Sequence, residues 1–174
     1  MKKILKPKFF NRPTLIVAKE LLGKYLVRKM GKKIISLQIT EVEAYDGHKD
    51  KASHSSRGQT KRNALMFDRA GIFYVYFTYG MHWMLNIVTG PKNYPAAIFI
   101  RGAGNISGPA RLTKFLKIDG TFNGKTASIK NGLWFEDRIE IISKKDIKRM
   151  PRIGVDYAEE IWSKKPYRFL LKFL

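Results

Sequence analysis

The segment E-V-E-A-Y, residues 41–45, places two carboxylates where the surrounding pattern calls for apolar side chains. It closes a run, 33–45, whose apolar residues alternate as in a half-buried strand. Five residues of that run are predicted to share one face of the strand: Leu37, Ile39, Glu41, Glu43 and Tyr45. A carboxylate on such a face is unfavourable unless it reaches water at the strand end or has a specific partner.

Two interpretations of this carboxylate pair follow. The structural one places both groups in solvent at the end of the strand. The chemical one makes Glu43, beside Tyr45, a general base whose pKa is tuned by a partly apolar pocket. A metal site is not expected, because none of the three histidines stands at a recognised ligand spacing from the two glutamates. The lack of cysteine excludes thiolate zinc sites, iron–sulfur clusters, disulfides and thiol catalysis.

The segment 72–86 is rich in aromatic residues and predicts two strands joined at Tyr79-Gly80. Tyr74 and Tyr76 are expected on one face of the first strand. Tyr79 is expected at the hairpin tip, where an aromatic ring of a basic protein can enter between base steps and unstack them. The alternative is that its ring folds back on its own hairpin.

Two further polar residues each allow two interpretations. Asn86, in the return strand, is either a structural polar group with its hydrogen bonds satisfied or a carboxamide that tests the edge of a base. His54, in a polar segment, is either a surface histidine or part of a pocket.

The charge of the chain indicates a polyanionic partner. Its 174 residues include 34 Lys and Arg against 14 Asp and Glu, which gives a net charge of +20. Nucleic acid is the first candidate, although a lysine-rich proteome would also raise this total. No run of about 20 apolar residues is present. Lys6, Pro7 and Lys8 interrupt the apolar start, so we expect a soluble, cytoplasmic protein with no secretion signal or membrane span.

Sequence pattern predicts one α+β domain, residues 1–174, with a mostly antiparallel sheet. Helices are expected at 13–22 and, capped by Ser107, from Pro109 to about 117. A capping box at Asp156 and Glu159 predicts a further helix start. A long surface loop is expected at 46–69. Strands are expected at 24–30, 33–45, 72–78, 81–88, 96–101, 133–142 and 167–174.

A carboxylate base, stacking aromatics, an aromatic hairpin tip and a basic surface together are typical of an enzyme that extrudes a nucleic-acid base and acts on it. The zinc deaminase pattern requires cysteines, which this chain lacks. Hydrolysis of the bond between base and sugar, by a water and a carboxylate, is the reaction that remains.

Several separate motifs, in order along the chain, resemble the alkyladenine (3-methyladenine) family of DNA glycosylases. These motifs are E-V-E-A-Y at 41–45, A-S-H-S-S-R-G at 52–58, T-K-R-N-A-L-M-F at 60–67, Y-V-Y-F-T-Y-G-M at 74–81, Asn86, I-R at 100–101, S-G-P-A-R-L at 107–112, R-I-G-V-D-Y-A at 152–158 and K-P-Y-R-F at 165–169. The resemblance implies a curved sheet flanked by helices, with a protruding hairpin.

The resemblance also implies roles in base excision repair without cofactor or metal. Glu43 would activate the attacking water, with Arg101 helping to hold it. Three residues would enclose the base rotated out of the duplex: Tyr45, His54 and Tyr76. Alkylated purines, of the 3-methyladenine type, would be the substrates, together with ethenoadenine or hypoxanthine. No lysine suggests a Schiff base, so strand cleavage is not expected.

Tyr79 would fill the gap in the duplex from the minor-groove side. Asn86 would meet the minor-groove edge of the purine, where the exocyclic amine of guanine clashes. The helix start at Gly108-Pro109, with Arg111 and Lys114, would meet the DNA backbone; a cap that serves stability alone is the alternative.

The segment 102–106 is shorter than in relatives of this kind, which predicts a more open pocket rim. A monomer acting on damaged double-stranded DNA, at the nucleoid if bacterial, is implied. Two competing functions stay open: a catalytically silent nucleic-acid-binding module, and another enzyme acting on a nucleotide or acyl substrate. Glu41 is assigned equally to a structural and a catalytic role.

Overall fold

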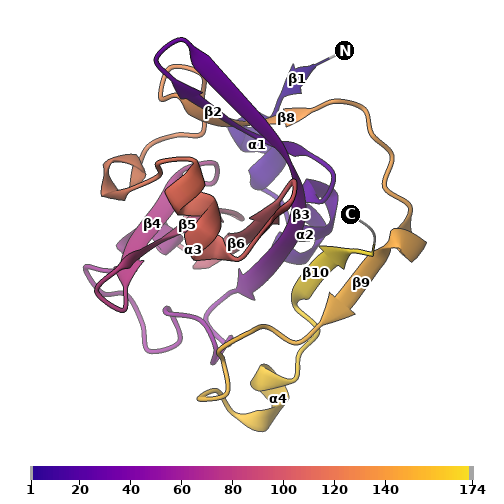
Figure 1. Cartoon of the computed structure of the whole chain (residues 1–174). Coiled ribbons are helices and arrows are strands. Elements are labelled where there is room, and N and C mark those ends of the chain that lie inside the picture. Colours follow the sequence, from indigo (N-terminus) through magenta and orange to yellow (C-terminus); the bar gives the residue numbers. More distant parts are fainter. Residues whose placement is uncertain (1, 173–174) are drawn as a thin grey trace.

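The structure is a computed structural model that describes residues 2–172 (Figure 1). Its α-helices are α1 (Pro7–Phe10), α2 (Thr14–Leu21), α3 (Pro109–Phe115) and α4 (Glu160–Ser163). Its strands are β1 (Lys3–Ile4), β2 (Tyr25–Met30), β3 (Lys33–Asp46), β4 (Phe73–Thr78), β5 (His82–Val88), β6 (Ala96–Ala103), β7 (Ile106–Ser107), β8 (Leu133–Asp137), β9 (Ile147–Met150) and β10 (Arg168–Leu171). The predicted α+β class is confirmed.

All ladders between these strands are antiparallel, in the order β1-β8-β2-β3-β6-β5-β4. The long strand β3 organises the sheet, because its first half pairs with β2 and its second half with β6. β10 pairs with β3 at residues 41–43 and with β9. The last strand of the chain therefore lies against the segment that carries both glutamates.

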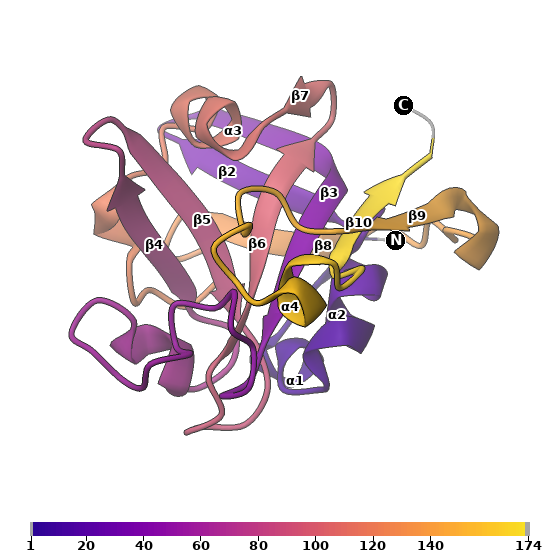
Figure 2. The same cartoon turned by 90° about the horizontal axis from the view of Figure 1, so that it is seen from below.

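One hydrophobic core joins the sheet to its helices. Val17, Ala18 and Leu21 form the buried stripe of α2, which packs against β3, while α3 packs against β5 and β6 (Figure 1). Leu112 and Leu116 bring α3 into the same core cluster. The β4–β5 hairpin extends from the body at the end of the sheet (Figure 2).

A β-bulge explains why carboxylates follow apolar residues in β3. The core cluster takes Ile39, then Val42 and Ala44, so the alternation changes by one residue. At this point the pairing of β3 with β6 shifts register, once between Ile39 and Glu41 and again between Glu41 and Val42. The prediction of one continuous face was wrong, because a bulge places an extra residue in the strand. Glu41, Glu43 and Tyr45 lie opposite the core.

Most predicted elements are present, with corrections at their ends. The strand predicted to reach Ile142 ends at Asp137, and the predicted strand 167–174 is β10, with Phe173 and Leu174 outside the described residues. Ser107 does not cap α3: Gly108 occupies that position, without a side-chain hydrogen bond. The capping box is wrong as well, since α4 begins after Glu159 with no side-chain cap.

The segment 46–69 departs most from its prediction as a surface loop. It contains a 3-10 helix, Ala64–Phe67, and several of its residues are buried: Asp50, Ala52, Ser53, Ser55 and Asn63. Sequence pattern missed this packing because polar residues at loop positions are buried here by pairing with one another and with a distant segment.

Candidate active site

A cavity of about 290 Å³ opens on the side of β3–β6 that faces away from the core. This volume is close to the lower end of the range for small-molecule sites. Two segments remote in sequence line it together with the sheet: 46–69 and 151–158. Figure 2 shows the second of these crossing in front of β6 and β3 on its way to α4.

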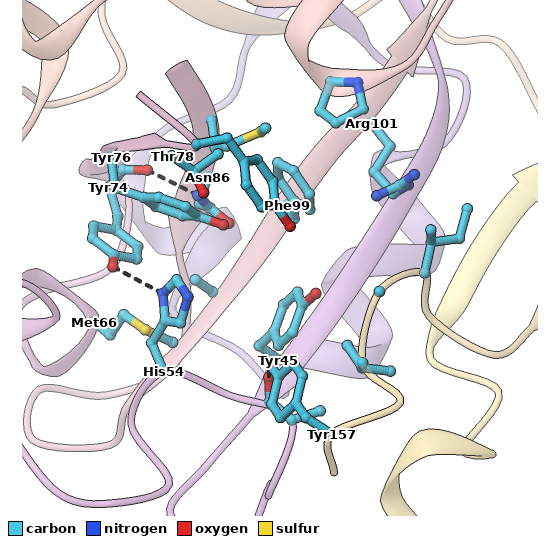
Figure 3. A pocket seen from close by; sticks show the side chains of 18 residues that line it. Tyr45, His54, Met66, Tyr74, Tyr76, Thr78, Asn86, Phe99, Arg101 and Tyr157 are labelled. Carbon is cyan, nitrogen blue, oxygen red and sulfur yellow. Dashed lines mark hydrogen bonds between the residues drawn. The ribbon is translucent and has the colours of Figure 1, made fainter. Parts of the chain in front are cut away.

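Aromatic rings form the cavity walls (Figure 3). On one side Tyr74 and Tyr76 project from β4, and the His54 ring lies 4.8 Å from that of Tyr76 in an edge-on arrangement. His54 Nδ1 lies 3.1 Å from the Tyr74 hydroxyl. Tyr45 and Tyr157 lie on another side. Rings at such angles leave flat apolar surface on which a heterocycle can stack.

His54 is held in place by its own loop. The Asn63 carboxamide donates to the backbone carbonyls of His54 at 2.8 Å and Gly58 at 2.9 Å, and its oxygen accepts from the Thr60 N–H. The pKa of His54 lies below its usual value, because partial desolvation against the wall disfavours the charged ring and because Arg62 adds positive charge, while the residue stays exposed at the cavity.

Tyr45 is backed by a buried cation. The guanidinium carbon of Arg152 lies 4.7 Å from the centre of the Tyr45 ring, and Arg152 donates to the backbone carbonyl of Ala44 at 2.9 Å. Asp50 accepts two hydrogen bonds from Arg152, at 2.5 and 2.8 Å, with both side chains fully buried. Arg152 thus joins the two segments that cover the cavity, 46–69 and 151–158, to each other and to Tyr45. The second of them, 151–158, is called the covering segment below.

Glu43 lies directly behind this wall and is completely buried. Its Oε2 accepts from the Tyr45 hydroxyl at 3.0 Å, and its Oε1 accepts from the backbone N–H of Ile153 at 2.8 Å. Arg101 Nε is 3.3 Å from the same Oε1. Burial raises the pKa of Glu43, and Arg101, Ile153 and Tyr45 oppose that shift. A buried carboxylate with a raised pKa beside a cavity is a candidate for acid–base chemistry.

The Tyr45 hydroxyl stays protonated beside this carboxylate. Burial, and next the negative charge of Glu43, raise the pKa of Tyr45 well above its usual value. Burial also raises the pKa of Tyr74 to about 12. The hydroxyls of Tyr45 and Tyr74 are therefore protonated and available as hydrogen-bond donors.

Asn86 and Tyr79 lie in very different surroundings. Asn86 is buried in β5, donates from Nδ2 to the Tyr74 carbonyl at 3.0 Å, and lines the cavity (Figure 3). Tyr79 is 84% exposed at the tip of the β4–β5 hairpin. Tyr79 and Gly80 have φ angles of 52° and 64°, as in the turns that join two antiparallel strands tightly. A positive φ is uncommon for a residue with a bulky side chain.

The remaining predicted residues lie at the margin of the site. Arg111 and Lys114 are exposed on α3, whose first residue, Pro109, lines the cavity. Within residues 2–172, no group of three or more His, Cys, Asp or Glu side chains is placed to hold a metal ion. No described helix is long and apolar enough to cross a membrane.

Several cavity residues escaped prediction from sequence. They are Met66, Tyr74, Phe99, the stretch from Ile153 to Val155, and Tyr157. Tyr74 had a usable signal, because it alternates with Tyr76 along one strand face. Residues 153–157 belong to a motif of the family resemblance, but their local pattern did not place them at the site, since their position depends on pairings with residues about a hundred positions away.

An aromatic cavity with a buried carboxylate and a guanidinium, on a strongly basic α+β chain, has the features expected of an enzyme that acts on a base in nucleic acid. The comparisons agree with this class. The profile described as "Methylpurine-DNA glycosylase (MPG)" matches residues 8–107 and 104–173, and the chain belongs to that family. The family consists of DNA glycosylases, which hydrolyse N-glycosyl bonds of damaged purines, and DNA is the substrate.

Curated relatives give the same result over nearly the whole chain. A protein of Legionella pneumophila (strain Paris) is 41% identical over 99% of this chain and 96% of its own length. One from Methanocella arvoryzae is 40% identical over 95% and 91%, and one from Psychrobacter cryohalolentis is 36% identical over 94% and 93%. Each bears the name "Putative 3-methyladenine DNA glycosylase".

Proposed function

We propose that this glycosylase rotates an alkylated purine of the 3-methyladenine type out of duplex DNA, stacks it in the aromatic cavity, and hydrolyses its bond to the sugar with Glu43 as base. The observation that carries the proposal is the buried Glu43 carboxylate, bonded to Tyr45 and Ile153 and close to Arg101, directly behind the cavity.

Alkylation at a ring nitrogen leaves the purine positively charged, so the base departs as a neutral molecule with the electrons of the N-glycosyl bond. A water oxygen then bonds to the sugar carbon, and Glu43 takes the proton. The negative charge of Glu43 also stabilises the positive charge that develops on the sugar. Arg101 helps to hold the water and the carboxylate.

Water must gain access to Glu43 for this reaction. The carboxylate has no exposed surface, and its oxygens are occupied by the Tyr45 hydroxyl, the Ile153 N–H and Arg101. We propose that stacking of the base on Tyr45 shifts one of these donors and that water replaces it. Tyr45, His54 and Tyr76 hold the base itself.

Tyr79 and Asn86 are proposed to act on the duplex and on base identity. The exposed ring of Tyr79 fills the space from which the base was rotated, which offsets the lost stacking. Asn86, buried and anchored to the Tyr74 carbonyl, meets the minor-groove edge of the purine and disfavours the exocyclic amine of guanine.

We propose that the chain, with its net charge of +20, binds nucleoid DNA as a monomer; the exposure of Arg111 and Lys114 beside the cavity supports a contact with the DNA backbone there. No lysine lines the cavity as described, which supports a monofunctional enzyme that leaves the DNA strand intact. Hypoxanthine and ethenoadenine are proposed as slower substrates, because these neutral bases must be protonated to leave.

Base release under single-turnover conditions tests this proposal. Duplex DNA would carry methylated purines, one ethenoadenine, one hypoxanthine or no damage, and abasic sites would be cleaved with alkali. We expect release of methylated purines first and no strand cleavage before alkali. Salt-sensitive binding without release of any base would instead identify a binding module that keeps the fold.

A further inference from the structure

Glu41 sits at a branch point beside the proposed catalytic pair. Its Oε1 accepts from Arg101 Nε at 2.9 Å, which is shorter than the 3.3 Å from that nitrogen to Glu43. The same oxygen accepts from Arg168 Nη1 at 3.1 Å. The side chains of Glu41 and of its two partners, Arg101 and Arg168, are at most 13% exposed, and that of Glu43 is fully buried.

Arg168 reaches this point from a different part of the chain. It begins β10, where its register partner on β3 is Glu43, and its Nε donates to the carbonyl of Pro151 at 2.9 Å. Pro151 precedes Arg152 and Ile153, the residues that anchor the cavity wall and bond to Glu43. Arg168 therefore holds Glu41 and the covering segment together.

We propose that Glu41 and Arg168 are positioning residues for the reaction: they orient Arg101 and determine how much of its positive charge acts on Glu43. Glu41 competes with Glu43 for Arg101, and Arg168 offsets the negative charge of Glu41. The role in turnover rests on the proposed function, whereas the charge balance is a property of the protein without DNA.

The charged and titratable groups around Glu43 come from five segments. From β3 they are Glu41 and Tyr45, from β6 Arg101, from β10 Arg168, and from the covering segment Arg152, with Tyr76 of β4 and Tyr157 farther away. Glu41 raises the pKa of Glu43 and Arg101 lowers it, although burial is the largest influence. Removing the charge of Glu41 and removing the charge of Arg168 are therefore expected to shift the pKa of Glu43 in opposite directions.

The test is a pH titration of Glu43 in three variants. Carbon-13 label at the glutamate carboxyls, with Glu43→Gln to assign the signal, reports the ionisation of Glu43 without DNA. Glu41→Gln should move its midpoint to lower pH by about one unit, because Arg101 then serves Glu43 alone. Arg168→Gln should move it to higher pH by roughly half a unit. The double variant should return toward the parent.

Matched variants separate this role from general stabilisation. Arg168→Lys keeps the charge and should titrate as the parent does. Arg149→Gln removes an exposed charge from the neighbouring strand, away from Glu41, and should leave the midpoint unchanged. Circular dichroism verifies the fold of each variant. If Glu41→Gln does not fold, the positioning role is decided by Arg168→Gln alone. Its midpoint is then compared with those of Arg168→Lys and Arg149→Gln.

Base release extends the test to the reaction. In the pH profile of the single-turnover rate, the acidic limb should move to lower pH in Glu41→Gln and to higher pH in Arg168→Gln, as in the titration. Shifts of one sign in both variants, or equal shifts from Arg149→Gln and Arg168→Gln, would overturn the inference. A parent chain that releases no base would contradict the proposed function alone, because the titration would still decide the positioning role.

Discussion

Arg152 and Asp50 form a two-fold hydrogen-bonded ion pair across 102 residues of sequence, with both side chains fully buried. Arg152 also lies against the ring of Tyr45, and the next residue, Ile153, bonds to Glu43. One pairing between two loop segments thus sets the wall of the cavity and one donor to the proposed base. Stability and site geometry are coupled at this pair.

Breaking this pair should destabilise the protein strongly. Arg152→Gln leaves the Asp50 carboxylate buried without its charge partner, so we expect the free energy of unfolding to fall by about 3–5 kcal/mol. Urea denaturation measures the change. The control is Lys164→Gln, which removes an exposed pair with Glu160 and should change stability by less than about 0.5 kcal/mol. Equal losses of unfolding free energy in the two variants would show that the buried pair stabilises the protein no more than an exposed one.

Tyr79 should oppose stability and favour activity. Its φ of 52° is unfavourable for a tyrosine and well suited to asparagine, so Tyr79→Asn should raise the free energy of unfolding by about 1 kcal/mol. Because the ring is lost from the hairpin tip, base release from duplex DNA should fall at least about tenfold. Tyr79→Leu keeps the strain and serves as control for stability. An unaltered release rate in Tyr79→Asn would contradict the proposal that the Tyr79 ring fills the space left by the base.

Stability should depend on pH through Glu43. Burial raises the pKa of Glu43 above 4.5, so the folded state binds this proton more tightly than the unfolded state. The contribution of Glu43 is therefore most favourable below the unfolded pKa and is lost as pH rises through the folded pKa. As pH rises from the unfolded to the folded pKa of Glu43, the unfolding free energy of the parent should therefore fall relative to that of Glu43→Gln. A constant difference from pH 4 to pH 8 would contradict the raised pKa.

The DNA backbone contacts can be tested by salt dependence. Arg111→Gln and Lys114→Gln should each weaken binding to any duplex and reduce the slope of log affinity against log salt by about 1. Lys3→Gln, in β1 at the opposite end of the sheet from the hairpin, is the matched loss of charge. If all three variants lower the slope alike, the effect reflects net charge and not contact at α3.

The course of β3 shows what sequence pattern can and cannot predict. Alternation located the strand, and the two glutamates marked the point at which it departs from a simple core strand. The pattern placed Ile39 and Glu43 on one face, whereas the core takes Ile39 and then Val42. The bulge responsible arises from pairing with β6, whose own register shifts at the same point, and no local preference records it.

The site divides in the same way. Tyr76, Tyr79 and Asn86 lie on a hairpin, so the period of two and the turn residues predicted their relative placement. Arg152 and Ile153 reach the site only through partners remote in sequence. Physical chemistry of the local sequence does not specify such contacts, because they depend on how two irregular segments pack over the finished sheet.

The most direct test of the central proposal is single-turnover release of methylated purines from duplex DNA by the parent chain and by Glu43→Gln, with binding to the same duplex measured in parallel. Gln preserves the size of the side chain and one of the two accepting oxygens, but its amide nitrogen only donates and it cannot take a proton from water. We predict that release falls roughly 100-fold or more while binding is retained. Release at the parental rate by Glu43→Gln would contradict the assignment of Glu43 as the base.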